Sequence, residues 1–158
     1  LELAGETTAL ARYTPAAAGA VRPLAAAGKR LSAGLRASAG KVAQQQALRA
    51  YAASLARASA ALGRLQPPPI LAPTHEAELA RLSSVSRLAL RLGHAIGAGD
   101  AQQVAALLLR FRQAGLASTG SAALADRALR AYDRRYRSIS AAATDLRREE
   151  LRLQAKLG

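Results

Sequence analysis

Leucine and alanine recur at alternating steps of three and four residues through most of this chain. From Val104 to Leu157 these steps keep their register without a slip. Such spacing places apolar side chains along one side of an α-helix, and that side has to pack against another helix. Alanine is the strongest helix former, and no stretch alternates with the period of two that a strand requires. The chain is therefore predicted to be all-α.

Prolines and glycines mark the ends of the predicted helices. Pro67-Pro68-Pro69 cannot continue a helix, and the segment Gly97–Asp100 combines a glycine suited to a helix C-cap with an aspartate suited to the next N-cap. A weaker interruption is expected at Gly115–Ser121, where glycines and hydroxyl residues lower the helix propensity. These boundaries predict a single domain over residues 1–158, folded as an antiparallel bundle of four long helices, or five if the last helix breaks.

A second architecture fits the same pattern. The last helix could run unbroken from Ala101 to Lys156, so that a three-helix head carries a two-helix coiled-coil stalk. We favour the compact bundle, because Pro15 and Pro23 should interrupt the first helix and Gly40 offers a further break.

Charge is distributed unevenly along the chain. The formal net charge is +13, and the segment between Glu6 and Glu76 has no carboxylate although it carries nine Lys or Arg residues. A surface with so little internal neutralisation attracts anions. Apart from Arg12, we predict that these basic residues contact an anionic partner: Arg22, Lys29, Arg30, Arg36, Lys41, Arg49, Arg57 and Arg64.

Residues that could carry chemistry are few. There is no cysteine, which excludes a disulfide framework, a zinc finger and a thiol nucleophile. His75 and His94 are nineteen residues apart and do not share a helical turn. Glu76 and Glu78 lie beside His75, but a metal site needs three or four ligands at a defined geometry, and we expect His75 to belong to the first turn after Pro73. We therefore expect no catalytic residues, no metal and no cofactor, and the protein is predicted not to be an enzyme.

The tyrosines are the main aromatic residues of the chain, beside a single phenylalanine, Phe111. We expect Tyr13, Tyr51, Tyr132 and Tyr136 to pack at the edge of the core with their hydroxyl groups directed to a partner or to water. Asp145, Arg148, Glu149 and Arg152 have the spacing of ion pairs along one exposed helix.

The turn residues carry a resemblance to a known group of proteins. Leu65-x-Pro-Pro-Pro, Gly99-Asp100 and the Ala-Tyr and Arg/Glu-rich pattern over residues 131–153 resemble exported or membrane-anchored, lipoprotein-like helical-bundle proteins of high-GC bacteria that have not been characterised. The resemblance covers roughly residues 47–157. It implies an extracytoplasmic location at the cell envelope and no activity. The chain opens at Leu1 without an initiator methionine, and we expect that a signal peptide or membrane anchor preceded it.

These observations favour a non-enzymatic cell-envelope bundle whose cationic surface binds anionic lipid, wall polymer or a protein partner. Two alternatives stay open. The charge also suits a basic helical protein that binds nucleic acid, although no helix-turn-helix spacing and no aromatic RNA-binding motif is present. The apolar positions Leu146, Leu153 and Leu157 would instead suit a coiled-coil module that forms oligomers.

Overall fold

The structure is a computed structural model that describes the backbone of residues 2–36 and 38–157. Side chains are described over the same ranges except at residues 2–4, 6, 116–129, 131, 132, 135, 136, 156 and 157. The chain divides into two compact units, Leu1–Ala122 (unit 1) and Ala123–Gly158 (unit 2). A single domain over residues 1–158 stays a prediction.

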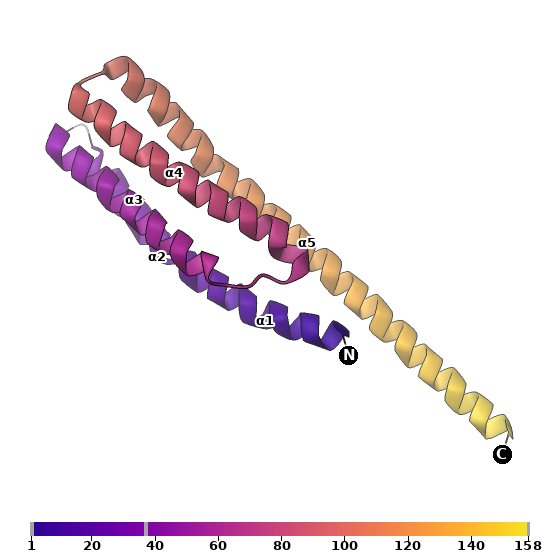
Figure 1. Ribbon diagram of the computed structural model, residues 1–158. Helices are drawn as coiled ribbons and strands as arrows, with labels where there is room; N and C mark the ends of the chain where they lie inside the picture. The colour runs from indigo at the N-terminus through magenta and orange to yellow at the C-terminus, as the bar shows by residue number, and fades with distance from the viewer. Residues whose placement is uncertain (1, 37, 158) are drawn as a thin grey trace. The chain divides into compact units, whose positions relative to one another are not determined.

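The described residues form α-helices and one short 3-10 helix, with no strand among them. The prediction of an all-α fold is confirmed (Figure 1). The elements in chain order are α1 (Glu2–Val21), α2 (Pro23–Gly34), α3 (Lys41–Gly63), η1 (Pro69–Leu71), α4 (Ala72–Ala98) and α5 (Ala101–Leu157). The alternative of a head with a coiled-coil stalk stays a prediction.

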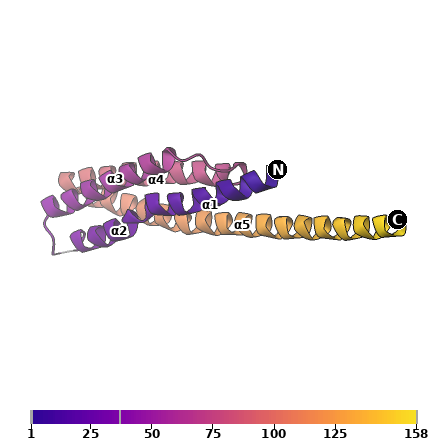
Figure 2. The ribbon, with the colours of Figure 1, turned by 90° about the horizontal axis from the view of Figure 1, so that it is seen from below.

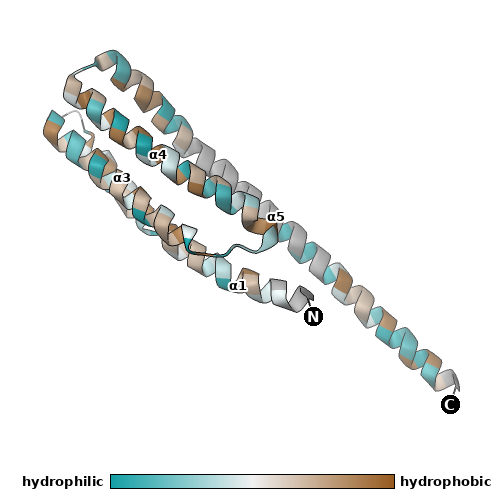
Figure 3. Ribbon diagram, in the orientation of Figure 1, coloured by the Kyte–Doolittle hydropathy of each residue, from teal (hydrophilic) through white to brown (hydrophobic). Residues whose placement is uncertain are grey.

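Helices α3 and α4 lie side by side as an antiparallel pair in Figures 1 and 2. Their facing side chains are the most buried of the described residues: Leu48 and Leu55 of α3 and Leu82 and Leu92 of α4 are at most 1% exposed. Hydrophobic and hydrophilic residues alternate along both helices in Figure 3, as the repeat of three and four requires. This pair is the centre on which the other elements of unit 1 pack.

Two hydrophobic clusters make up the core of unit 1. One joins Leu31 of α2 and Leu107 of α5 to the α3–α4 pair at the end where α4 meets α5. The other surrounds Leu55 and Leu82 near the proline turn, where Leu24 of α2 packs against it. Phe111 of α5 packs against both clusters. The start of α5 therefore closes the bundle together with α2.

The turn between α4 and α5 forms as the Gly97–Asp100 sequence predicts. Gly99 adopts the left-handed conformation, with φ of 73°, and its amide donates to the carbonyl groups of Ala95 and Ile96. The Asp100 carboxylate then accepts a hydrogen bond of 3.0 Å from the amide of Gln103. A left-handed glycine and an N-cap aspartate satisfy the backbone groups that two helix ends leave open.

The helix boundaries near the N-terminus correct one expectation. Pro23 begins α2 and Gly40 is the N-cap of α3, as predicted, but Pro15 lies inside α1 and does not interrupt it. Pro15 is exposed, so its ring and the hydrogen bond that it cannot make face solvent, while Leu10 is buried on the other side. Burial of the inner face thus outweighs the local cost of the proline.

The structure also assigns the Gly115–Ser121 segment to α5, so no helix boundary occurs there. The side chains of residues 116–121 lie outside the described residues. In unit 2, the expected ion pairs along α5 are confirmed: Arg148 lies 3.6 Å from Asp145, and Arg152 lies 3.5 Å from Glu149.

Candidate anion-binding surface

All eight residues that were predicted to contact an anion are exposed to solvent in unit 1. They come from the end of α1 through α3, and neither α2 nor α3 contains an Asp or Glu residue. Among the described residues, no carboxylate lies within ion-pair distance of any of the eight, which are Arg22, Lys29, Arg30, Arg36, Lys41, Arg49, Arg57 and Arg64.

The basic residues elsewhere in the described chain are neutralised more often. Arg81 of α4 holds the carboxylate of Glu78 with two hydrogen bonds, and this pair is largely shielded from solvent. Arg137 pairs with Asp133 at 2.7 Å on the exposed surface of unit 2. Arg87 and Arg91 of α4 and Arg110 and Arg112 of α5 also lack an ion pair among the described residues of unit 1. What marks residues 22–64 is that their own sequence contains no Asp or Glu.

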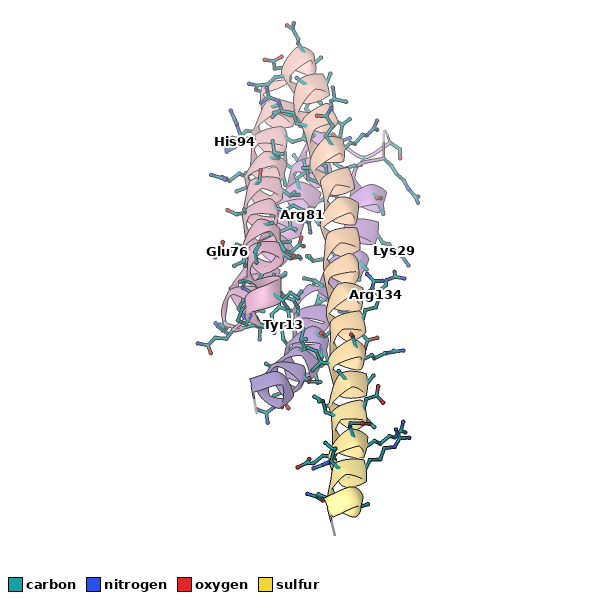
Figure 4. All side chains as sticks on the ribbon, turned by 90° about the vertical axis from the view of Figure 1, so that its right-hand side faces the viewer. Tyr13, Lys29, Glu76, Arg81, His94 and Arg134 are labelled. Carbon is teal, nitrogen blue, oxygen red and sulfur yellow. The ribbon has the colours of Figure 1, made fainter. Side chains whose placement is uncertain are left out.

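The structure separates the eight residues into groups rather than gathering them at one point. Arg30 of α2 and Arg57 of α3 line the same groove between these helices. Arg49 instead lines a small depression between α3 and α4, beside His94. Lys29 and His94 project from opposite sides of unit 1 in Figure 4. The Arg30–Arg57 combination brings two predicted residues from different helices to one groove.

Lys41 has a different local role. The position of a Cβ atom on Gly99 would be 3.2 Å from the Lys41 ammonium, so this side chain reaches the turn that ends α4. A cation near a helix C-terminus is stabilised by the carbonyl groups that the helix leaves unpaired. The charge of Lys41 therefore also stabilises the C-terminal end of α4.

The groove between α2 and α3 has a volume of about 330 Å³. Besides the two arginines, it is lined by alanines of both helices, by Leu31 of α2, and by Tyr51 and Ser54 of α3. Ser54 donates a hydrogen bond of 3.0 Å to the carbonyl of Ala50 and accepts one of 3.3 Å from the Arg57 guanidinium. Both arginines were predicted from the sequence, but the groove was not, because the pairing of α2 with α3 joins residues that are far apart along the chain.

His75 is the most buried of the polar groups in the described part of unit 1, at 6% exposed. Its Nδ1 atom lies 2.8 Å from the hydroxyl of Tyr13, and the two rings are tilted against one another. Burial raises the pKa of the Tyr13 phenol above its usual 10.0, and the nearby Glu78 carboxylate raises it further. The prediction that the tyrosines pack at the core edge with a partner for the hydroxyl is confirmed for Tyr13.

Tyr51 also packs at the edge of the core, against both hydrophobic clusters. It is half buried, and its ring meets Phe111 edge-on with ring centres 5.9 Å apart. Burial raises the pKa of Tyr51, while the positive charge of Arg81 opposes this rise. The hydrogen bond from Arg81 to Glu78 in turn raises the pKa of Arg81. The side chains of Tyr132 and Tyr136 lie outside the described residues.

The polar residues around His75 form no ligand set. Within the described parts of the chain, no group of three or more His, Asp or Glu side chains is arranged to hold a metal ion. In Figure 4, Glu76 lies on the outer side of α4, whereas Arg81 points to the interior. The Tyr13–His75 contact joins α1 to α4.

Among the described helices, none contains a segment long and apolar enough to cross a membrane. No family model, no curated protein and no solved structure matches this chain.

Proposed function

We propose that this protein is a non-enzymatic helical bundle of the cell envelope that binds the headgroups of anionic lipids through the basic surface of α1 to α3. The observation that carries the proposal is that all eight predicted basic residues are exposed to solvent. Helices α2 and α3, in or beside which they lie, contain no acidic residue. Each Lys or Arg close to an anionic membrane contributes about 1 kcal/mol, so several together are enough for peripheral binding.

The envelope location rests on the resemblance of the turn and cap residues, Leu65–Pro69 and Gly99-Asp100, to exported bundle proteins. The electrostatic part of the proposal rests on the charges themselves. Because exposed charges are screened over about 8–10 Å at physiological ionic strength, binding should weaken as salt rises.

Co-sedimentation with vesicles tests this function. The protein should bind vesicles that contain phosphatidylglycerol and leave vesicles of phosphatidylcholine unbound, and the binding should fall as salt is raised. Equal binding to both kinds of vesicle, or binding to neither, would overturn the proposal. Tight binding to duplex DNA at physiological salt without vesicle binding would favour the nucleic-acid alternative.

A matched pair of charge variants makes the test specific to the surface. One variant replaces Arg22, Arg36 and Arg64 by glutamine, and the control replaces Arg137, Arg148 and Arg152, which form ion pairs in unit 2. Both lose the same formal charge. The first should bind anionic vesicles more weakly than the control. An equal loss in both would mean that net charge alone, and not this surface, attracts the vesicle.

Self-association is a second candidate, and one feature of unit 2 favours it. Ile139, Leu146 and Leu153 follow one another at seven-residue spacing and are 48%, 72% and 55% exposed. A stripe of this kind suits pairing with a second copy of the chain. Sedimentation equilibrium over a range of concentrations should then show a dimer that Leu146→Gln and Leu153→Gln abolish. A monomer at every concentration would exclude it.

A further inference from the structure

The groove between α2 and α3 is apolar at its base and open to solvent. Ala27 and Leu31 of α2 form part of this base and are buried, whereas Ala50 and Ala53 of α3 also line it and are exposed. Its volume of about 330 Å³ lies at the lower end of the range for sites that hold a small molecule. Covering exposed apolar surface of this kind is favourable in water.

Small side chains explain why the groove exists. At Gly34 the backbone of α2 comes so close to α3 that an added Cβ would meet Ala47 at 2.5 Å. Farther along, the facing residues of α3 that line the groove include Ala50 and Ala53, which are too short to fill the space between the two helices. The groove therefore lies beside the close contact between α2 and α3 at Gly34.

Both helices contribute an arginine to the lining of this groove. Arg30 extends from α2 and Arg57 from α3, and both line the groove. The hydrogen bond of Arg57 to Ser54 uses one of the five donors of its guanidinium, and Ser54 is itself held by the Ala50 carbonyl. Since no carboxylate among the described residues pairs with either arginine, the remaining donors are available to an anion.

We propose that this groove binds a single anionic phospholipid taken from the bilayer surface, with part of one acyl chain on its apolar base and the phosphate between Arg30 and Arg57. The proposal rests on the proposed function and adds a defined site to it. A purely ionic ligand would leave the apolar base of the groove exposed, and a purely apolar ligand would make no use of the charges of Arg30 and Arg57. Arginine donors match phosphate oxygens in geometry as well as charge.

Soluble probes separate the two halves of the ligand. Dodecyl phosphate below its micelle concentration carries both a chain and a phosphate, dodecyl maltoside carries the chain alone, and inorganic phosphate carries the charge alone. Calorimetric titration should show binding of dodecyl phosphate that is about tenfold or more tighter than that of either other probe, because each loses one half of the contacts. In a labelled sample, the amide signals of Ala50 and Ser54 should shift.

Two pairs of variants locate the site. Ala50→Trp fills the groove without changing charge, and Ala56→Trp is its control, because Ala56 is exposed on the same helix and does not line the groove. The double variant Arg30→Gln with Arg57→Gln is compared with the double variant Arg87→Gln with Arg91→Gln on α4, which removes the same charge from exposed residues that do not line the groove. The groove variants should weaken dodecyl phosphate binding about tenfold or more, and the controls should stay within about twofold.

The outcomes distinguish this proposal from the proposed function. If dodecyl phosphate does not bind, or if Ala50→Trp binds it as well as Ala56→Trp does, the groove is not the site, even where anionic vesicles still bind to the basic surface. If dodecyl phosphate binds in the groove but vesicles do not bind at all, the bilayer is not the source of the ligand and the envelope function fails. Equal helical circular dichroism and equal thermal midpoints establish that each variant and its control are folded.

Discussion

The hydroxyl of Tyr13 in α1 lies 2.8 Å from Nδ1 of His75 in the first turns of α4. This contact joins residues that are 62 positions apart and fixes α1 against the proline turn. The histidine is nearly fully buried and no other hydrogen-bond partner is found for it among the described residues, so its nitrogen depends on the tyrosine.

Replacing Tyr13 by phenylalanine should therefore lower the free energy of unfolding by about 1–3 kcal/mol, the usual cost of leaving a buried polar group without its partner. Urea unfolding followed by circular dichroism measures this change. Replacing His75 by leucine in the same chain removes the unpaired nitrogen, so the double variant should recover part of the loss. Additive losses in the double variant would contradict the coupling between the two residues.

Stability should fall at alkaline pH because of the same tyrosine and Tyr51. Burial is the main cause that raises the pKa of both phenols above 10.0 in the folded protein. The folded state then holds its protons more tightly than the unfolded state, so the contribution is complete below pH 10 and is lost as pH rises through the folded pKa values. Urea unfolding between about pH 9 and about pH 11 should show this decline. Its slope should be smaller in a variant with phenylalanine at both positions.

Core truncation should separate the two faces of α4. Leu82 is 0% exposed and belongs to the cluster near the proline turn, whereas Leu90 on the same helix is 44% exposed. Leu82→Ala should lower the free energy of unfolding by about 2–5 kcal/mol, because it removes buried contacts and leaves a cavity. Leu90→Ala should change it by less than about 1 kcal/mol. Similar losses at both positions would mean that the burial on α4 is assigned to the wrong face.

Two glycines of α2 should respond to alanine with opposite signs. A Cβ on Gly28 would have no neighbour within 4 Å, so Gly28→Ala should stabilise the helix by about 0.5–1 kcal/mol. A Cβ on Gly34 would meet the Cβ of Ala47 at 2.5 Å, and because both atoms are attached directly to backbone, the helices would have to separate. Gly34→Ala should destabilise by about 1–3 kcal/mol. Thermal unfolding of the two variants compares them directly, and stabilisation by both would contradict the close approach of α2 to α3.

Local features of the sequence were sufficient to predict much of the fold. Leu48, Leu55 and Leu82, which fall on the repeat of three and four residues, are buried. Gly99 and Asp100 cap the helices that they were expected to cap. Such features depend on residues a few positions apart, so periodicity and turn chemistry identify them.

The face of α4 that a single repeat of three and four residues marks is narrower than the face that the structure buries. The repeat runs through Leu82, Ser86 and Gly93, but Val85 and Leu92 are also among the buried residues of the core clusters. Helix α4 packs against α3, and the first hydrophobic cluster also brings Leu107 of α5 into contact with it. A helix with two neighbours buries a wider face than a single heptad seam describes.

The groove and the Tyr13–His75 contact could not be predicted in the same way. Both depend on which helices become neighbours: Arg30 meets the side of α3 that carries Arg57, and α1 meets the start of α4. The many alanines do not indicate which helices become neighbours, because a small side chain is compatible both with a closely packed helix interface and with an open groove. The charge pattern identified the two arginines without indicating that they share a site.

The uneven burial along the bundle has a consequence for its slow motions. Leu10, at 8% exposed, is the one buried residue among the described side chains of α1, whereas α3 contributes Leu48, Leu55 and Leu62 to the core. Local opening should therefore begin at α1, and its amide protons should exchange with deuterium well before those of α3. Each such excursion would bring His75 into transient contact with water while the α3–α4 pair stays closed.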